Sequence, residues 1–369
     1  MNTKQLQFLA DIQTGPFGSQ LHKEDYVEIG TPIVTVEHLG NRIFTEQNLP
    51  RVSDDDKARL EKYVLQHGDI VFSRVGSVDR CSFVDEKHDG WLFSGRCLRV
   101  RPNEQIDAMY LYYYFCMEET KQFVRNIAVG ATMPSINTKL MGEVPITYPS
   151  LIEQKRTAKI LAAIDDRIEN NTKINDNLQQ QAQAIYASMF IDNADPAWEQ
   201  GHLSDLIAVK YGKDHKKLAD GSYPVYGSGG IMRHVERPLY DKESVLIPRK
   251  GTLNNVMYVN QPFWSVDTMF YTEMRLPNVA KFVYHFVKAK DLASMNAGSA
   301  VPSMTTDILN AIEVAIPSAS ALEEFEALVS PMYKAMQEND NQSEILAKLR
   351  DALLPKLMSG EIDVSDIQL

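Results

Sequence analysis

Three short stretches of the sequence contain residue types that are used in catalysis or nucleotide binding. The run RKGT from Arg249 has the charge and glycine of a phosphate-binding loop, but such a loop places its lysine after the glycine. The glycine-rich run YGSGG from Tyr226 lacks a surrounding strand-to-helix pattern and is typical of a turn. His234 and Glu236 form half of a zinc deaminase signature, yet no Pro-Cys-x-x-Cys follows. No Asn-Pro-Pro-aromatic or Asp-Pro-Pro-aromatic tetrapeptide of a DNA-amino methyltransferase occurs.

The residues therefore favour a binding and assembly protein with no catalytic or metal-ligating site, and an enzyme with an unrecognised site is the alternative. With 369 residues, 44% of them hydrophobic and 24% charged, the chain is long enough for two or three globular domains. Its three cysteines form no CxxC pair, so neither a disulfide nor a zinc site is predicted. No signal-like or membrane-spanning run is present, and we expect a cytoplasmic protein without membrane contact.

The net charge of −11 argues at first against a nucleic-acid partner. Residues 318–369 contain ten acidic and four basic residues, however, and so supply −6 of this charge. Basic clusters can still exist on the rest of the chain. The charge predicts that the chain alone would hold DNA weakly.

The sequence repeats itself at nearly half its length. The run GATMPSINTKLMGEVPI from Gly130 returns as GSAVPSMTTDILNAIEVAI from Gly298. Pro134 and Pro302 are 168 positions apart (302 − 134), as are Ser135 and Ser303. Upstream, the strand-like runs GDIVFSRVGSV from Gly68 and ESVLIPRKGTL from Glu243 both end in Arg-x-Gly. The repeat predicts two copies of one α+β domain that is rich in short strands and turns.

A long helix is predicted behind each copy, because residues 153–190 and 332–354 lack Gly and Pro. At a period of 3.5 the first segment has an apolar stripe of Leu161, Ile164, Ile168, Ile174, Leu178, Ile185 and Met189. The second has Leu322, Phe325, Val329, Met332, Met336, Leu346, Leu353 and Leu357. The shared heptad frame favours packing of the two helices on each other, and separate packing on the domain surfaces is the alternative. Pro331 and Pro355 are expected to kink the second helix near its ends.

These motifs, in this order and twice over, resemble the specificity (S) subunit of type I restriction-modification systems. The resemblance covers nearly the whole chain. It is carried by TGPFGSQLHKEDYVEIGTPIV from Thr14, YPVYGSGGI from Tyr223, PFWSVDTMFY from Pro262, PSLIEQKRTAKILAAID from Pro149 and LLPKLMSGEI from Leu353, together with the two Arg-x-Gly strings. The second helix departs from the pattern, since it lacks the Glu-Gln pair that Glu153 and Gln154 form in the first.

The resemblance implies an α+β fold in which two repeated target recognition domains are joined by two long helices. The helices would form an antiparallel coiled coil with pseudo-two-fold symmetry. The expected segments are target recognition domain 1 (1–150), spacer helix 1 (151–191), target recognition domain 2 (192–317), and spacer helix 2 with the C-terminal tail (318–369).

The implied function is to read a bipartite, asymmetric site in double-stranded DNA. Two methyltransferase subunits, which would carry S-adenosylmethionine, are the expected partners, and two restriction-translocase subunits can join them. No cofactor is expected in this chain. A solitary or regulatory S-like subunit, a scaffold without DNA contact, and a part of another methyltransferase-linked defence complex are the alternatives.

Candidate DNA contacts within this frame are polar side chains on loops. In the first domain they are Ser19, Gln20, Arg74, Ser77 and Arg80, and in the second Lys213, Lys216, Lys217, Arg249, Lys250 and Asn254. Solvated surface positions are the alternative for each of them.

The expected coiled-coil interface is centred on Asn171 and Asn339, at the midpoints of the two helices. Setting them opposite each other pairs Ile164 with Leu346, Leu178 with Met332, and Ile185 with Phe325, all apolar. Ile168 and Leu353 complete the interface. A buried Asn in such a seam fixes register at a cost in stability. Asn residues that face solvent at a gap in the seam are the alternative.

Overall fold

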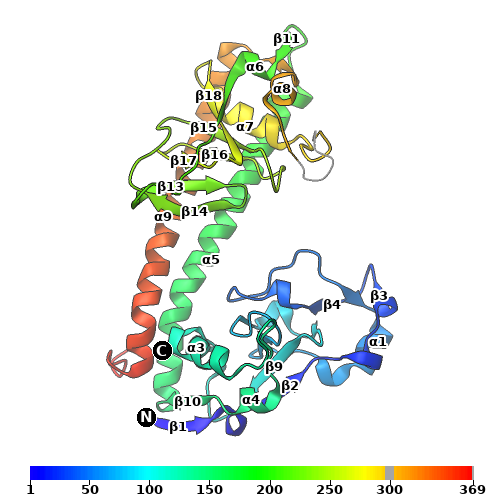
Figure 1. The fold of residues 1–369 in the computed structure, drawn as a ribbon, viewed down its shortest axis with the longest axis vertical. Helices are drawn as coiled ribbons and strands as arrows, with labels where there is room; N and C mark the ends of the chain where they lie inside the picture. Colours follow the sequence, from blue (N-terminus) through cyan, green and yellow to red (C-terminus); the bar gives the residue numbers. More distant parts are fainter. Residues whose placement is uncertain (296–302, 368–369) are drawn as a thin grey trace. The chain divides into compact units, whose positions relative to one another are not determined.

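The computed structural model describes residues 1–295 and 303–367. The chain divides into two compact units, residues 1–171 with 341–369 (unit 1) and residues 172–340 (unit 2). Each unit holds one globular domain and part of each of two long helices, α5 (Leu151–Ala187) and α9 (Ala319–Ser359) (Figure 1). The helices are thus shared between the units, because each domain packs against parts of both.

Three small sheets make up the described part of the unit 1 domain. Its strands are β1 (Asn2–Gln5), β2 (Ala10–Thr14), β3 (Tyr26–Val27), β4 (Thr31–Val34), β5 (Arg51–Val52), β6 (Ile70–Ser73), β7 (Cys81–Phe83), β8 (Leu92–Phe93), β9 (Cys97–Pro102) and β10 (Pro145–Tyr148). The central sheet is antiparallel in the order β2-β9-β6-β7. A second sheet has the order β3-β5-β4-β8, with β4 and β8 parallel, and β1 pairs with β10. The helices are α1 (Asp54–Arg59), α2 (Ala108–Cys116), α3 (Glu118–Ile127) and α4 (Thr138–Gly142).

The described part of unit 2 repeats this plan. Its strands are β11 (Glu199–His202), β12 (Ile207–Tyr211), β13 (Asp220–Gly227), β14 (Gly230–Val235), β15 (Ser244–Pro248), β16 (Met257–Val259), β17 (Trp264–Ser265), β18 (Met269–Met274) and β19 (Glu313–Ile316). The central sheet has the order β12-β18-β15-β16, a second sheet has the order β14-β13-β17, and β11 pairs with β19. The helices are α6 (Leu203–Leu206), α7 (Ala280–Lys288) and α8 (Thr306–Asn310), and a π-helical turn (Ser188–Asp192) follows α5.

The two units therefore share the topology of the central sheet and of the terminal strand pair, and the prediction of a duplicated α+β domain is confirmed; the second sheet of unit 1 has the additional strand β3. The central sheets match strand for strand, and β13 and β17 are parallel as β4 and β8 are. Helix α8 begins 168 positions after α4 (306 − 138), whereas β18 begins 172 positions after β9 (269 − 97). Loops of different length between the elements account for the drift in spacing.

The core of unit 1 lies between the central sheet and the long helices. Helix α2 provides Leu111 and Phe115, which are buried with Phe72 of β6 and with Leu161 of α5 and Leu357 of α9. The rings of Phe72 and Phe115 meet edge to face with centroids 4.7 Å apart. Because α2 has the sheet on one side and the long helices on the other, nearly all of its residues are apolar or aromatic.

Unit 2 has the same layers. Helix α7 buries Phe282 and Val283 together with Phe270 of β18, and Tyr186 of α5 and Phe325 of α9 belong to the same cluster. Burial of each such side chain stabilises the fold by roughly 1.5–3 kcal/mol. The aromatic-rich segments MYLYYYF from Met109 and KFVYHFV from Lys281 are thus the buried helices that join each sheet to α5 and α9.

The start of α5 explains why the two long helices begin differently. Gln154 is fully buried, accepts a hydrogen bond from the Asp107 N–H at 2.8 Å and donates one to the Pro149 carbonyl at 2.9 Å. The position 168 residues later is Leu322, which is buried among apolar residues of unit 2. The start of α5 is therefore fastened to the loop before α2 by the hydrogen bonds of Gln154. The start of α9 is fastened to unit 2 by the apolar contacts of Leu322.

Polar contacts also link each domain to the helices at equivalent positions. In unit 1 the Tyr113 hydroxyl donates to the buried Asp165 at 2.7 Å, and Arg350 of α9 donates to the other oxygen of Asp165 at 2.8 Å. In unit 2 His285 of α7 lies 2.8 Å from the Tyr333 hydroxyl of α9. Tyr113 and His285 are 172 positions apart, and Asp165 and Tyr333 are 168 apart, so the same contact is made by different residues.

The contact at His285 gives unit 2 a predictable response to pH. Burial, with a smaller effect of Lys288, lowers the pKa of His285 from its usual 6.5 to about 4. The groups around the ring are Gln183 and Tyr186 of α5, Tyr333 of α9, and Tyr284 and Lys288 of α7. Between about pH 6.5 and pH 4 His285 is protonated in the unfolded chain but stays neutral in the folded one. The free energy of unfolding therefore falls as the pH falls.

We expect this acid loss to reach roughly 3 kcal/mol and to shrink in His285→Gln, which cannot titrate. Urea unfolding followed by tryptophan fluorescence between pH 4.5 and 7 measures it. His234→Gln, at an exposed position of β14, is the control and should keep the acid loss of the wild type. An equal acid loss in His285→Gln and in the wild type would contradict the prediction.

Candidate nucleic-acid interface

The Arg-x-Gly turn of unit 1 follows β6 and is held by main-chain hydrogen bonds on both sides. The N–H of Arg74 donates to the Arg96 carbonyl at 2.8 Å, and the Arg74 carbonyl accepts from the Ile136 N–H at 3.0 Å. The N–H of Gly76 donates to the Pro134 carbonyl at 2.8 Å. The turn therefore lies against the segment that contains the Pro-Ser motif.

The turn of unit 2 follows β15, and its arginine has the same main-chain bonds. The N–H of Arg249 donates to the Thr268 carbonyl at 2.9 Å, and its carbonyl accepts from the Met304 N–H at 2.9 Å. An isolated β-bridge joins Lys250 to Ser303. Residues 298–302 of the second Pro-Ser motif lie outside the described residues.

In unit 1 the corresponding bridge joins Val75 to Ser135. The two halves of the sequence repeat, Arg-x-Gly and Pro-Ser, are thus bonded to each other in both units. This explains why both strings recur together, although some 60 residues separate them in the chain. In the sequence the Pro-Ser strings indicate the duplication but not their contact with the Arg-x-Gly turn. Their shared 168-residue spacing is the signal that marks them as equivalent positions.

The turn glycines have a backbone that other residues rarely adopt. Gly76 has φ +75° and Gly251 has φ +86°. A Cβ on Gly76 would meet no atom within 4 Å, whereas one on Gly251 would lie 2.7 Å from Oγ of Ser228. Glycine is needed at Gly76 for its backbone alone, and at Gly251 for backbone and space together.

The family model of the type I restriction modification DNA specificity domain matches residues 1–180 and again residues 196–353. The chain belongs to this family. Each of the two matches spans one domain and the segment of long helix that follows it, so the duplicated unit is a repeated family domain. The chain is a DNA specificity subunit of a type I restriction-modification system, a component for DNA recognition rather than catalysis.

Curated relatives agree with this assignment. The MjaIX type I restriction enzyme specificity subunit of Methanocaldococcus jannaschii is 25% identical over 311 residues, which cover 73% of this chain and 72% of the relative. The HindI specificity subunit of Haemophilus influenzae is 21% identical, with 82% of this chain and 88% of the relative covered. Among solved structures, the type I S subunit from M. genitalium has the same fold, with a TM-score of 0.61, 19% identity, and 96% and 95% of the two chains covered.

The predicted DNA contacts of the first domain of this specificity subunit differ in their surroundings. Arg74 is partly exposed and Ser77 is exposed on the turn. Arg80 is exposed, but its guanidinium donates to the Leu39 carbonyl. Gln20 accepts a hydrogen bond from the Tyr63 hydroxyl at 2.7 Å. The backbone of Ser19 lies in the 3-10 turn Gly18–Gln20, and its side chain lies outside the described part of the structure.

In the second domain the predicted lysines are free of ion pairs within the described part of the chain. Lys213, Lys216 and Lys217 are exposed on the loop after β12, and Lys250 is exposed on the turn. Arg249 is partly exposed. Asn254 is exposed, but both ends of its amide bind the protein: it donates to Asp291 at 3.1 Å and accepts from the Ala293 N–H at 2.9 Å. Contact of each of these residues with DNA stays a prediction.

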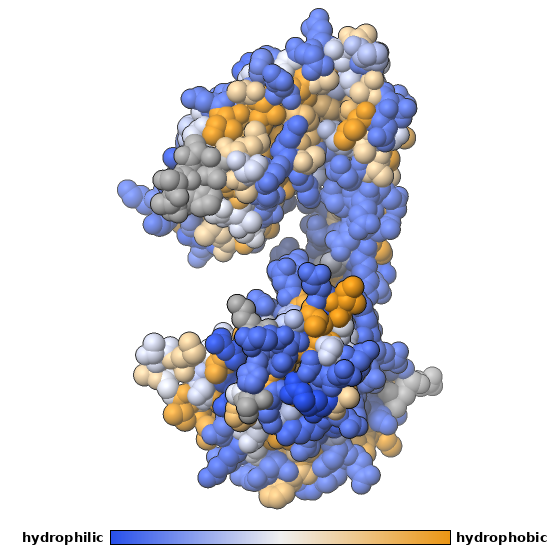
Figure 2. All heavy atoms as spheres, turned by 90° about the vertical axis from the view of Figure 1, so that its right-hand side faces the viewer, coloured by the Kyte–Doolittle hydropathy of each residue, from blue (hydrophilic) through white to orange (hydrophobic). Residues whose placement is uncertain are grey.

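The face of the molecule in Figure 2 is mostly hydrophilic on both units, with smaller hydrophobic groups between the polar ones. Among the described residues no helix is long and apolar enough to cross a membrane.

The long helices run antiparallel where they pack within each unit. In unit 1 Asn171, which is 1% exposed, donates to Gln342 at 3.0 Å and to Ser343 at 3.1 Å. In unit 2 Asn339 donates to the Asn175 side chain at 2.8 Å, and Asn175 donates to Asp340 at 2.7 Å. Both predicted Asn residues thus make polar contacts inside the seam. Their direct pairing with each other stays a prediction.

The apolar positions of the seam are placed as follows. Phe325 is fully buried, while Ile164, Ile168, Leu178, Ile185, Met332, Leu346 and Leu353 are partly buried on the two helices. Ile174 departs from its predicted place in the apolar stripe, because it is 45% exposed. Asn171 and Asn175, on either side of Ile174 in the sequence, bond to α9 and so face the seam. Ile174 lies outside the helix face that carries these two Asn residues. The helix assignment of α9 continues through Pro331 and Pro355.

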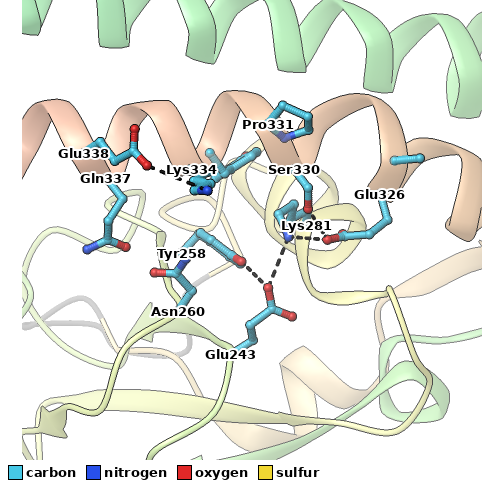
Figure 3. Close-up of a pocket in the computed structure, with 12 residues that line it drawn as sticks. Glu243, Tyr258, Asn260, Lys281, Glu326, Ser330, Pro331, Lys334, Gln337 and Glu338 are labelled. Carbon is cyan, nitrogen blue, oxygen red and sulfur yellow. Dashed lines mark hydrogen bonds and ion pairs between the residues drawn. The ribbon is translucent and has the colours of Figure 1, made fainter.

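A charged cleft between the second domain and α9 is a candidate ligand site that the sequence did not reveal (Figure 3). Lys281, 4% exposed at its side chain, donates to Glu326 at 2.6 Å and to Glu243 at 3.1 Å. Its Nζ lies 5.2 Å and 5.6 Å from the ring centroids of Tyr258 and Tyr333. Tyr258 donates to Glu243, and burial with this carboxylate raises the pKa of Tyr258. Because both carboxylates pair with Lys281, the cluster fastens α7 to α9.

The turn geometry predicts a specific cost of substitution at Gly76. In Gly76→Ala the new methyl group meets no neighbour, so the cost is backbone strain alone, about 1 kcal/mol. We expect the thermal midpoint of unit 1 to fall by roughly 2–4 °C. Gly76→Asn should lose less, because Asn tolerates the left-handed region better than Ala. Differential scanning calorimetry of the two variants tests the prediction, which equal midpoints for Ala and Asn would contradict.

Proposed function

We propose that this specificity subunit reads a bipartite, asymmetric DNA site, each domain recognising one half, and that it carries two methyltransferase subunits. The observation that supports this is the repeated turn. Both domains hold an Arg-x-Gly turn whose arginine makes the same main-chain bonds, while the residue between the arginine and the glycine differs, Val75 in one and Lys250 in the other. One scaffold with two sets of exposed side chains is suited to two different half-sites.

The chemistry is then supplied by the partners. The methyltransferase subunits would hold S-adenosylmethionine, and two restriction-translocase subunits can join the complex. The acidic net charge of −11 is compatible with this arrangement, because the partners can provide much of the phosphate contact that gives general affinity. This chain would contribute sequence preference rather than the bulk of the binding energy.

The experiment is to map methylated bases in the DNA of cells that contain the methyltransferase subunit with and without this chain. A single bipartite motif that depends on the chain is expected. The purified chain alone should neither bind S-adenosylmethionine nor cleave DNA. Methylation without a chain-dependent motif would exclude the proposal, and activity of the chain alone would favour an enzyme.

Exchange of one domain should change one half of the site. Residues 196–317 can be replaced by the matching domain of a relative, because both junctions lie outside the helices and strands, between the π-helical turn and β11 and between β19 and α9. The matching domain must keep the buried face of α7. We expect a methylation motif with a new second half and an unchanged first half. The reciprocal exchange of residues 1–150 is the control, and a change of both halves in either chimera would refute modular recognition.

The two long helices should set the spacing between the half-sites. Four residues inserted after Gln180, with four more at the facing position of α9 between Phe325 and Met336, lengthen each helix by about 6 Å. Given ~3.4 Å per base pair, the recognised site should keep both halves and gain one or two unspecified base pairs between them. Methylation mapping measures the spacer. An active complex with an unchanged spacer would contradict a ruler function of the helices.

A further inference from the structure

The guanidinium of Arg74 is held on two sides. Its Nη1 donates to the Gly95 carbonyl at 3.2 Å, and its Cζ lies 6.0 Å from the ring centroid of Phe17. The Nε atom is buried and has no hydrogen-bond partner in the described part of the chain. Only the two Nη atoms are therefore available to a ligand.

The guanidinium of Arg249 in the second domain is held in the same way. Its Nη1 donates to the Asp267 carbonyl at 3.2 Å, and its Cζ lies 5.4 Å from the ring centroid of Tyr211. Arg74 and Arg249 also have equivalent main-chain bonds, to Arg96 and to Thr268. The two arginines are therefore one structural element that occurs twice.

The aromatic rings come from equivalent places in both domains, near a glycine that follows the first strand of the central sheet (β2 or β12) and lies against the residue after β8 or β17. A Cβ on Gly15 would lie 2.2 Å from the Ser94 carbonyl oxygen, and one on Gly212 would lie 2.1 Å from the Val266 carbonyl oxygen. Phe17 lies two residues after the first glycine, and Tyr211 lies immediately before the second. The rings are 59% and 52% exposed. Each ring thus supports an arginine while much of its surface stays open.

This arrangement is suited to reading a base rather than holding a phosphate. A phosphate can be bound by any mobile cation, and the exposed Lys213, Lys216 and Lys217 provide such charges without fixed side-chain contacts in the described structure. A guanine edge needs two donors in one plane, opposite O6 and N7. A guanidinium that already lies over an aromatic ring and donates a hydrogen bond loses little further freedom when it makes that contact.

We infer that Arg74 and Arg249 each read a guanine through O6 and N7, and that Phe17 and Tyr211 are positioning residues that keep the guanidinium in plane. The inference rests on the proposed function and adds the base that is read and the residues that read it. It requires a G·C pair in each half-site. The preference for that pair in the first half depends on Arg74 and the preference in the second half on Arg249.

The test uses the complex with methyltransferase subunits and a DNA library with randomised half-sites. Arg74→Lys keeps the charge and removes the planar fork. We expect it to reduce the preference for one G·C pair of the first half-site by roughly 10- to 100-fold, with the second half unchanged. Phe17→Leu should weaken the preference at the same base pair. Arg249→Lys and Tyr211→Leu should act on the second half-site alone.

Lys216→Ala is the matched control for a phosphate contact. It should weaken methylation of all sequences alike and lower the salt dependence of binding by about one counterion, without changing the motif. A uniform loss of the same kind in Arg74→Lys would show a phosphate contact and overturn the inference. Thermal midpoints equal to that of the wild type exclude misfolding as the cause of a changed motif.

A second measurement needs no variant. Replacing single guanines of each half-site by 7-deazaguanine removes the N7 acceptor, and one such replacement per half-site should weaken binding of the wild-type complex. Unchanged affinity at every guanine would overturn the inference. A wild-type complex without any sequence preference would refute the proposed function as well, whereas a bipartite preference that survives both Arg→Lys changes would refute this inference alone.

Discussion

The packing of α5 against α9 is the interaction on which the rest of each unit depends. Both helices bury apolar residues in the cores of the units, and helices in proteins gain most of their stability from such packing. The domains are fastened to this pair of helices by buried polar groups. Asp165 lies in the interior of unit 1 and is compensated by Tyr113 of the domain and Arg350 of α9. Removing one partner of such a buried charge costs about 3–5 kcal/mol, so helix pairing and domain attachment are coupled.

Much of the fold could be predicted from the sequence, because the repeat records bonds that only certain residues permit. Gly76 and Gly251 recur because the turn needs positive φ, and the Pro-Ser strings recur because their main chain bonds to that turn. Helix α5 and helix α9 were visible as segments without Gly or Pro. Ile174 is exposed because the seam positions next to it are occupied by Asn171 and Asn175, which bond to α9.

The candidate interface was less predictable, because it depends on contacts between side chains that are distant in sequence. Asn254 and Arg80 have the chemistry of base-reading residues, yet Asn254 binds Asp291 and Arg80 binds the Leu39 carbonyl. Phe17 and Tyr211 escaped notice for a different reason. Their glycine neighbours Gly15 and Gly212 are 197 positions apart, so a search at the 168-residue spacing does not align them. The cluster at Lys281 joins Glu243, Tyr258 and Glu326, which are far apart in the sequence and form no local pattern.

Duplication within one chain separates what must stay constant from what can vary. The main-chain bonds of the turn arginine are the same in both units, and these bonds keep the turn in place whatever side chains it presents. The side chains on the turn are under no such constraint, as Val75 and Lys250 show. Two identical subunits related by a two-fold axis read a palindrome, because any change in one half appears in the other. Two copies in one chain can change separately, and the bound sequence can then differ between the halves while the fold remains the same.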